Sequence, residues 1–591
     1  MKLSSDLPVP TTVYELLLQS SIRFADETAL TYLKDVSSHL IDEKISYSEL
    51  IKNINRMVRL IHDQAESTGK KRPVVSFLLP NIPQAHYILW GAGTAGIANP
   101  LNPLLSENAL LALTQKAQTD ILIALGPNPV SDIWQKAQSV AQQLPNKPKL
   151  IPVAFSNNES GESFESMLAG YSPEPLPKEW LPAADSITAY FHTGGTTGTP
   201  KLAMHSHVNH LCTAKAYLRT MDAGVGDVGL NGLPLFHVAG ALIVGLGALA
   251  AGVNTVLPTM AGFRNPQVVS RYWHLVEHYR VTVGGAIPTS VAAIADVPIA
   301  GADISSLRYM ITGGAPLPLS VPEKIKTVTG RDLYQVYGMT ETAGVTVMPN
   351  LENEPVPGSA GHISGEIEVR IDSGSNTTEA VGEICVRGPM VFQGYLGVAE
   401  SPLDKGWLRT GDLGYIDNNN NLFITGRAKD LIIRSGHNID PATIETCLES
   451  HPAVSMAAAV GKPDIYAGEL PVAYVQLHPN QSVSESVLRD YALAHIDERP
   501  ACPKQVVVIE ALPLTAVGKI HKPTLRARSA KLAVEEALAV FSVTANALVL
   551  ANGGIQVKVT AARSDSEFNA ACVDLAKQLN LEIEAVEGAL A

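Results

Sequence analysis

Residues 193–201 read Thr-Gly-Gly-Thr-Thr-Gly-Thr-Pro-Lys, a set of side chains suited to holding phosphate groups. Glycines let backbone N–H groups approach phosphate oxygens closely, and hydroxyls and a lysine add donors and positive charge. Because the apolar residues 186–191 before it predict a buried strand, we interpret this segment as a polyphosphate loop. The alternative is an ordinary surface turn. The residues expected to contact phosphate are Thr193, Gly194, Gly195, Thr196, Thr197, Gly198, Thr199 and Lys201.

The loop differs from that of kinases and other P-loop NTPases. In their motif, Gly-Lys-Ser/Thr opens a helix. Here Thr199 and Pro200 separate Gly198 from Lys201, and a proline disfavours a helical conformation at the residue before it. The sequence therefore argues against a P-loop NTPase.

The segment 334–342, Tyr-Gln-Val-Tyr-Gly-Met-Thr-Glu-Thr, predicts a second strand that ends in polar residues. Tyr337 offers a flat face to a base, and Thr340 offers a hydroxyl to a phosphate. Glu341 is a hard oxygen ligand of the kind that Mg²⁺ prefers. The alternative is a plain strand end with Glu341 in solvent.

Paired glycines and a single aspartate mark two more candidate positions. Gly313 and Gly314 follow an apolar run, and without a Cβ they let the backbone approach a planar ligand, although a tight turn would also need them. Asp412 lies between glycines, in an expected turn, and its carboxylate is suited to two ribose hydroxyls; its alternative role is an Asx-turn. Arg427 would add a second ribose or phosphate contact.

Lys519 stands in the segment 512–520, which contains proline and glycine. A single lysine on such a loop is usually just solvated. The functional interpretation is a lysine that swings into an active site.

Together and in this order, these segments resemble the superfamily of adenylate-forming enzymes, which includes acyl-CoA synthetases, the adenylation domains of peptide synthetases and firefly luciferase. The resemblance covers about residues 10–528 and is greatest to acyl-CoA synthetases. It implies that a carboxylate attacks the α-phosphorus of ATP and releases pyrophosphate, without a covalent enzyme intermediate. A thiol then attacks the acyl-adenylate. ATP, Mg²⁺ and coenzyme A are the small molecules that the resemblance implies.

The resemblance also implies a role for each matching residue. Lys519 matches the catalytic lysine of the first half-reaction, Glu341 the Mg²⁺ contact and Lys429 the hinge between two domains. The turn formed by Ser435, Gly436 and His437 matches the border of the pantetheine tunnel in the second half-reaction. Beyond the phosphate loop, the nucleotide contacts would be Gly313, Gly314, Ala315, Pro316, Tyr337, Gly338, Met339, Thr340, Asp412 and Arg427.

Two departures from the family pattern are visible. Residues 192–195 read His-Thr-Gly-Gly where the family more often shows Ser/Thr-Ser-Gly-Ser/Thr, and residues 202–203 read Leu-Ala where glycine is common. Enough hydroxyls and glycines remain for phosphate binding. Thr443 stands where the family usually carries glutamate, which weakens an assignment there but not at Gly436.

The acid pocket is expected along segments 236–240, 285–288 and 313–314. Amino-acid-activating relatives place an aspartate at the start of the first segment, where this chain has Phe and His, so an amino acid is not expected. His237 either lies beside the substrate carboxylate or gates its pocket, or it is a buried histidine satisfied by backbone. A small, apolar lining favours an aliphatic or aryl acid, fatty acids included. The expected lining residues are His237, Val238, Ala286, Ile287 and Gly313.

Coenzyme A is the expected acceptor, because no carrier domain is recognisable after the second domain. The alternatives are transfer to a separate carrier protein or release of acyl-AMP. A protein of another class would keep the fold only to bind nucleotide or acyl ligands, and intact Lys519, Glu341 and Asp412 argue against it.

The elements that must position these residues follow an α/β pattern. Short apolar runs such as 73–79 and 120–124 alternate with helical spacing such as 83–95, which predicts layered, largely parallel sheets. We expect an N-terminal domain over residues 1–427, with a β-rich subdomain from about 358, and a small mobile α+β domain over 428–528. Residues 529–591 would form a short α/β extension of unknown role.

The amino-acid composition limits the classes of molecule that the protein is expected to bind. The chain has 591 residues, 46% of them hydrophobic, and a net charge of −13, which fits a multi-domain globular protein and argues against a general nucleic-acid binder. Five separated cysteines without CxxC fit a reducing cytoplasm. The apolar run 238–253 is short for a membrane span, so no integral membrane segment is expected. The expected partner is a small carboxylic acid, and a homo-oligomer is compatible with the sequence.

Overall fold

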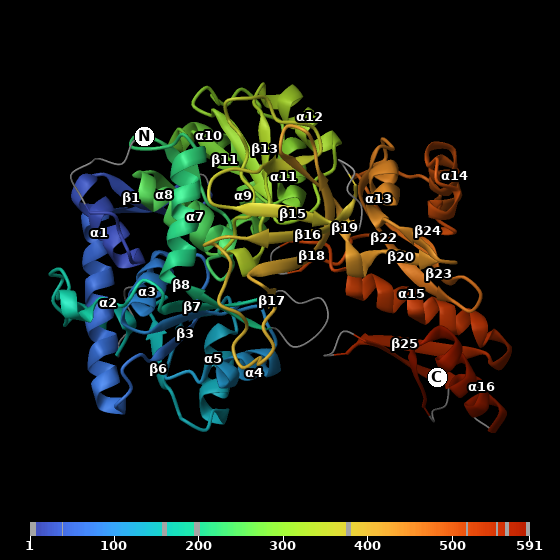
Figure 1. Ribbon diagram of the computed structural model, residues 1–591, viewed down its shortest axis with the longest axis horizontal. Helices are drawn as coiled ribbons and strands as arrows, with labels where there is room; N and C mark the ends of the chain where they lie inside the picture. The colour runs from blue at the N-terminus through green and yellow to red at the C-terminus, as the bar shows by residue number, and fades with distance from the viewer. Residues whose placement is uncertain are drawn as a thin grey trace.

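The computed structural model describes residues 8–37, 40–155, 162–193, 201–373, 380–515, 518–550, 554–561 and 566–586. Within these ranges the chain is a mixed α/β structure with five sheets, so the expected fold class is confirmed. Figure 1 shows a large body, coloured blue to yellow, with the last two sheets beside it in orange and red. None of the described helices combines the length and apolar character needed to cross a bilayer.

The first sheet has the strand order β6-β5-β3-β4-β7-β8 and is parallel except between β7 and β8. Every residue of β5 is buried, as expected for a parallel strand covered on both faces. The strands are β3 Val74–Leu78, β4 Ile97–Pro100, β5 Ile121–Leu125, β6 Lys149–Val153, β7 Ile187–His192 and β8 Leu202–Ser206. The phosphate loop connects β7 to β8, and its residues 194–200 lie outside the described ranges.

The second sheet has the order β13-β12-β11-β9-β10-β1-β2 and is parallel except between β1 and β2. Parallel strands bring their carboxyl ends to one edge, which is where ligands bind in such sheets. The segments that follow β11, β12 and β13 are those expected to line the site. The strands are β1 Thr28–Asp35, β2 Ile41–Ser46, β9 Val228–Leu230, β10 Asn254–Pro258, β11 Val283–Gly285, β12 Tyr309–Gly313 and β13 Leu333–Val336.

Several of the helices that accompany these two sheets begin at side-chain caps, among them α1, α2, α4 and α7. Thr12 and Glu15 form a reciprocal capping box at the start of α1, which satisfies two otherwise unpaired N–H groups. The helices are α1 Val13–Arg23, α2 Tyr47–Thr68, α3 Pro83–Ala95, α4 Glu107–Ala117, α5 Ile133–Gln143, α6 Phe164–Ala169, α7 His207–Thr220, α8 Ala248–Ala251, α9 Pro266–Ser270, α10 Tyr272–Tyr279, α11 Pro288–Ala295 and α12 Ser320–Thr329, with shorter turns η1 Lys178–Trp180, η3 Gly262–Arg264 and η4 Thr340–Thr342.

The apolar run 238–253 is a π-helix, η2 (Ala239–Gly247), followed by α8. Its glycines permit close contacts, since a Cβ on Gly247 would come within 2.6 Å of the Tyr217 ring and one on Gly240 within 2.4 Å of the Pro234 carbonyl oxygen. π-helical turns often occur at functional sites, and this one forms a wall of the cavity described below.

The third sheet is antiparallel, in the order β14-β19-β18-β16-β15 with β17 beside β18. Asp412, expected in a turn, lies within β18 opposite Arg427 of β19. Gly411 has a φ of 74°, a conformation that glycine adopts without strain, and it lies where the register of β18 against β16 shifts, so the strand passes through an irregularity instead of turning. The strands are β14 Ser359–His362, β15 Glu368–Asp372, β16 Gly382–Arg387, β17 Leu403–Asp404, β18 Trp407–Ile416 and β19 Asn421–Arg427.

The fourth sheet follows the short turn η5 (Ala428–Asp430) and has the order β21-β20-β23-β22, with β24 parallel to β23. It packs with α13 and α14 around a core of its own. The elements are β20 Ile432–Arg434, β21 His437–Ile439, α13 Pro441–Glu449, β22 Val454–Asp464, β23 Gly468–Leu477, α14 Glu485–His495, η6 Arg499–Ala501, β24 Gln505–Val508 and α15 Lys522–Ala537.

The C-terminal extension shares α15 with the fourth sheet. Its sheet, β25-β26-β27, buries Val557 and Val559 together with Ala530 and Val534 of α15 and Phe568 of α16. The helix therefore packs against both units, as the red and orange elements of Figure 1 show. The remaining elements are η7 Ala539–Phe541, β25 Val543–Val549, β26 Ile555–Ala561, α16 Ser566–Leu579 and β27 Glu582–Ala585.

Candidate active site

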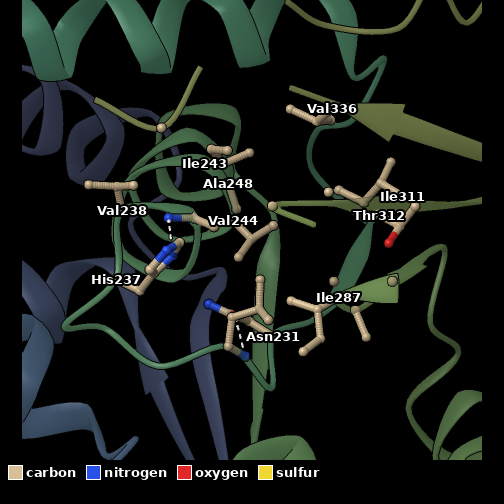
Figure 2. A pocket seen from close by; sticks show the side chains of 18 of the residues that line it. Asn231, His237, Val238, Ile243, Val244, Ala248, Ile287, Ile311, Thr312 and Val336 are labelled. Carbon is tan, nitrogen blue, oxygen red and sulfur yellow. Dashed lines mark hydrogen bonds between the residues drawn. The ribbon is translucent and has the colours of Figure 1, made fainter. Parts of the chain in front are cut away.

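An apolar cavity lies at the carboxyl edge of the second sheet. Figure 2 shows Ile287 and Ile311 from the strand ends facing Val238 and Val244 from the π-helical segment. All five residues expected to line an acid pocket, His237, Val238, Ala286, Ile287 and Gly313, line this cavity. Tyr217, Ala248 and Thr255 also line it.

Lys519 enters this cavity from the loop that precedes α15. Its Cε lies 3.5 Å from the position that a Cβ on Gly314 would occupy, so a side chain at Gly314 would crowd the lysine. The loop is held in place because Thr289 donates its hydroxyl to the Gly518 carbonyl at 3.0 Å. Burial, and then the charge of Arg427, lowers the pKa of Lys519 to about 8, although Asp412 and Glu341 oppose the shift.

His237 faces the cavity in its neutral form. Its Nδ1 accepts a hydrogen bond from the Ala239 N–H at 3.2 Å, as the dashed line in Figure 2 shows. Burial, followed by the charges of Lys519 and His192, lowers the pKa of His237 to about 3. The backbone bond of one interpretation is present and the ring lines the cavity, while a role beside the substrate carboxylate or as a gate stays a prediction.

Glu341 lies in the turn η4 and is 8% exposed, so it is not the solvated strand end of the alternative interpretation. The Tyr395 hydroxyl donates to its Oε1 at 2.6 Å. The ammonium of Lys201 lies 4.7 Å from the centre of the same tyrosine ring. The neighbouring Thr340 carbonyl is 2.8 Å from Nε2 of the buried His205.

These groups suit Mg²⁺ carried by a nucleotide. No cluster of three or more His, Cys, Asp or Glu side chains suited to a metal occurs within the described ranges. The buried carboxylate of Glu341 matches the way Mg²⁺ is usually held, by one or two carboxylates and substrate phosphates. The residues present therefore fit Mg²⁺ that arrives with ATP.

Asp412 joins the second and third sheets. It is 4% exposed, accepts the Tyr337 hydroxyl at Oδ2 and pairs with Arg427 at Oδ1. Burial, and then the Asp412 charge, raises the pKa of Tyr337, which keeps the hydroxyl protonated as a donor. Tyr337 and Asp412, expected to hold the base and the ribose, are thus brought into contact.

Other expected residues lie outside the cavity or the described ranges. Gly338 lines the cavity, whereas Met339, Ala315 and Pro316 do not belong to its lining. The Thr193 N–H donates to the Lys201 carbonyl at 2.8 Å, which closes the ends of the phosphate loop. The loop residues outside the described ranges are Gly194, Gly195, Thr196, Thr197, Gly198 and Thr199.

The residues expected at the hinge and the pantetheine tunnel lie in η5 and at the turn from β20 to β21. Lys429 lies in η5, and its carbonyl accepts from the Arg526 guanidinium at 3.1 Å, while Asp430 pairs with the same arginine at 2.6 Å. Ser435, Gly436 and His437 are exposed and lie apart from the cavity lining. The φ values of Ser435 (50°) and Gly436 (84°) are typical of a two-residue hairpin turn between β20 and β21.

Sequence reasoning missed Tyr395 and His205. Both contact residues far away in the chain, Glu341 and Thr340, so local patterns carry little signal for them. For His205, the sequence does contain a signal, because three histidines, His205, His207 and His210, lie close together soon after the phosphate loop. The departure at His192 has a structural role, because its Nε2 accepts from the Asn102 N–H at 3.2 Å.

Comparison with known proteins identifies the family. Residues 19–396 match AMP-binding enzyme, and residues 443–519 match AMP-binding enzyme C-terminal domain. Marinolic acid–CoA ligase of Pseudoalteromonas sp. (strain SANK 73390) is 34% identical over 531 residues, which cover 87% of this chain and 81% of that protein. Long-chain-fatty-acid–CoA ligase of Bacillus subtilis (strain 168) is 28% identical, with 88% and 95% covered.

A solved structure of another CoA synthetase is also similar to this chain. O-succinylbenzoate CoA synthetase of Bacillus subtilis, in complex with the acyl-adenylate intermediate OSB-AMP, gives a TM-score of 0.69 at 27% identity and covers 86% of this chain and 97% of that chain. The extension formed by β25 to β27 lies beyond the residues matched by either family domain. This chain belongs to the AMP-binding enzymes, the adenylate-forming superfamily that its motifs resemble.

Proposed function

We propose that this chain is an AMP-forming acid–CoA ligase that activates an apolar carboxylic acid with ATP and transfers the acyl group to coenzyme A. The observation that carries the proposal is Lys519, which reaches from the small domain into an apolar cavity beside Gly314. A cation in that place is suited to a reaction between two anions.

The nucleotide would bind across the edge of the second sheet. Tyr337 would stack on the base beside the backbone of residues 313–316, and Asp412 with Arg427 would hold the ribose. The phosphate loop, residues 193–201, would cradle the phosphates. Mg²⁺ bound by Glu341 and phosphate oxygens supplies charge neutralisation when present.

In the first half-reaction the substrate carboxylate attacks the α-phosphorus, and pyrophosphate leaves with the electron pair of the broken bond. Positioning and charge neutralisation dominate such a step. Lys519 would stabilise the charge that develops at the α-phosphate. His237 is neutral and faces the cavity, where it would border the carboxylate.

In the second half-reaction the thiol of coenzyme A attacks the acyl carbonyl, and AMP leaves. Lys519 fills the site in the present arrangement, so the small domain must turn before a thiol can approach. We propose Lys429 as the pivot and the turn at Ser435, Gly436 and His437 as the face that replaces Lys519. The domains would divide near residues 427 and 528.

The acid should be apolar. The cavity wall is built from small and branched aliphatic residues, and none of the described residues that line it is acidic, so it offers no partner for an α-ammonium group. The names of the two curated relatives, ligases of marinolic acid and of long-chain fatty acids, support the same class. Free cysteines support a reducing, cytoplasmic location.

Release of pyrophosphate and AMP from MgATP, measured over a panel of acids with and without coenzyme A, tests the proposal. Turnover that needs both an apolar acid and coenzyme A is the expected result. Pyrophosphate release that does not depend on coenzyme A would favour the alternative, an acyl-AMP ligase that loads a carrier protein. Absence of turnover with every acid would contradict both.

A further inference from the structure

Tyr395 lies between two groups of opposite charge that the proposed function assigns to MgATP. Its hydroxyl donates to Glu341 Oε1 at 2.6 Å, and its ring lies 4.7 Å from the ammonium of Lys201. Burial, and then the neighbouring carboxylate, raises the pKa of the phenol, so it stays protonated and acts as the donor. One side chain thus contacts the anion through its edge and the cation through its face.

The backbone around Tyr395 also bonds to the turn of Glu341 and to the strand that follows Lys201. The Phe392 N–H donates to the Glu341 carbonyl at 2.9 Å, and the Leu396 N–H donates to the Leu202 carbonyl at 2.9 Å. Leu202 begins the strand that leaves the phosphate loop. Phe392 also packs edge-to-face on the Tyr395 ring at 4.8 Å, which limits the freedom of that ring. The segment 392–396 therefore fixes both the turn of Glu341 and the exit of the phosphate loop.

This arrangement lets two opposite charges lie near each other without neutralising one another. The aromatic face stabilises the Lys201 ammonium, and the hydroxyl occupies one oxygen of the Glu341 carboxylate. The lysine charge remains available to a phosphate, and the second carboxylate oxygen remains available to a cation. Carboxylates that bind metals are commonly held by such a hydrogen bond.

We propose that Tyr395 is a positioning residue that orients Glu341 for Mg²⁺ and Lys201 for the nucleotide phosphates, through two separable contacts. The inference rests on the proposed function only for the identity of the ligand, MgATP. Removal of the hydroxyl should weaken metal binding. Removal of the ring should also weaken binding of the nucleotide phosphates.

The test uses the full chain and α,β-methylene ATP, which binds but cannot release pyrophosphate. Calorimetry measures its binding without metal, and electron paramagnetic resonance of free Mn²⁺ measures metal binding to the complex. Tyr395→Phe keeps the ring, so Mn²⁺ affinity should fall about 10- to 100-fold while metal-free nucleotide binding stays as in wild type. Tyr395→Leu should also weaken metal-free nucleotide binding, about two- to fivefold.

The matched control is Tyr171→Phe, which removes another tyrosine–carboxylate hydrogen bond, from Tyr171 to Asp63 at 2.9 Å. It should leave Mn²⁺ affinity unchanged. Equal Mn²⁺ affinity in wild type and Tyr395→Phe, or an equal loss in Tyr171→Phe, overturns the positioning role alone. A wild-type chain that does not bind the analogue overturns the proposed function together with this inference.

Discussion

The hydroxyl of Tyr337 donates to Oδ2 of Asp412 at 2.7 Å. Tyr337 follows the last strand of the second sheet, and Asp412 belongs to the antiparallel third sheet. Both side chains are buried, 7% and 4% exposed, so the contact fixes how the two sheets meet. It also sets the spacing between the groups proposed to hold the base and the ribose.

Asp412→Ala should weaken both the fold and nucleotide binding. It leaves the Tyr337 hydroxyl buried without an acceptor and Arg427 without its partner, which costs about 1–3 kcal/mol of the free energy of unfolding. The Kd for ATP should rise about tenfold or more because a charge-assisted contact is lost. Urea unfolding and calorimetry measure the two effects. Asp417→Ala, at a turn of the same sheet, should leave the Kd unchanged; an equal rise there would contradict the assignment.

Lys519→Ala should impair adenylation far more than thioester formation. Loss of one preorganised electrostatic group typically costs about 2.7–4 kcal/mol of transition-state stabilisation, or roughly 100- to 1,000-fold in rate. Single-turnover formation of acyl-AMP measures the first step, and reaction of synthetic acyl-AMP with coenzyme A measures the second. Equal losses in both steps would show that the lysine serves another role.

The pH profile of adenylation should reveal the lowered pKa of Lys519. Because that pKa is about 8 in the free protein, the lysine loses its charge as pH rises through this value. We expect kcat/KM for ATP in the adenylation step to fall above about pH 8. Arginine keeps its charge, so Lys519→Arg, even if slower, should show no such fall. A profile shared by both proteins would assign the titration to another group.

Lys429→Pro should show the opposite pattern to Lys519→Ala. Proline fixes φ, which would prevent the proposed pivot from turning while leaving the present arrangement, with Lys519 in the cavity, intact. Acyl-AMP formation should continue and thioester formation should stop, as rapid-quench assays of each half-reaction would show. The control is Lys522→Ala, which lies on the small domain but outside η5. Normal overall turnover of Lys429→Pro would remove this residue as the pivot.

The protein should lose stability steeply in mild acid. Burial holds the pKa of several histidines below 6.5, so the unfolded chain binds protons that the folded protein does not bind. The folded state is therefore fully favoured above about pH 6.5, and each fully buried histidine should lose about 1–2 kcal/mol as pH falls from 6.5 to 5. Among the described residues, the histidines no more than 1% exposed are His86, His205, His207 and His210.

Urea unfolding at several pH values between 7.5 and 5 measures this loss. Both ring nitrogens of His86 lack a hydrogen-bond partner, so His86→Met removes a titrating group without breaking such a bond. Its free energy of unfolding should depend less steeply on pH than that of wild type. If the free energy of unfolding of the variant depended on pH as steeply as that of wild type, His86 would not be one of the groups that cause the loss.

The sequence predicted the layered fold and the cavity because both depend on local signals. Apolar runs and glycine pairs mark the strand ends, and parallel strands must bring these ends to one edge, so Ile287 and Gly313 meet in the cavity as expected. Lys519 could be placed there only through the family resemblance, since a lysine on a loop has no local feature that directs it across a domain boundary.

Long-range pairing explains what the sequence did not reveal. Asp412 appeared to lie in a turn because glycines flank it, but pairing with Arg427 on the next strand extends the sheet through it. Tyr395 acquires its role only when the backbone of the third sheet region pairs with residues from the first. Such pairings depend on tertiary packing, which outweighs local turn preferences.

Helix α15 packs against both the C-terminal extension and the proposed small domain. Its residues fill the core beneath β26 and also pack on β22. Arg526 on the same helix donates a hydrogen bond to the carbonyl of Lys429, the proposed pivot. If the small domain turns as proposed, this shared packing would carry β25 to β27 along with it. A fluorophore attached to α16 would therefore report the proposed rotation.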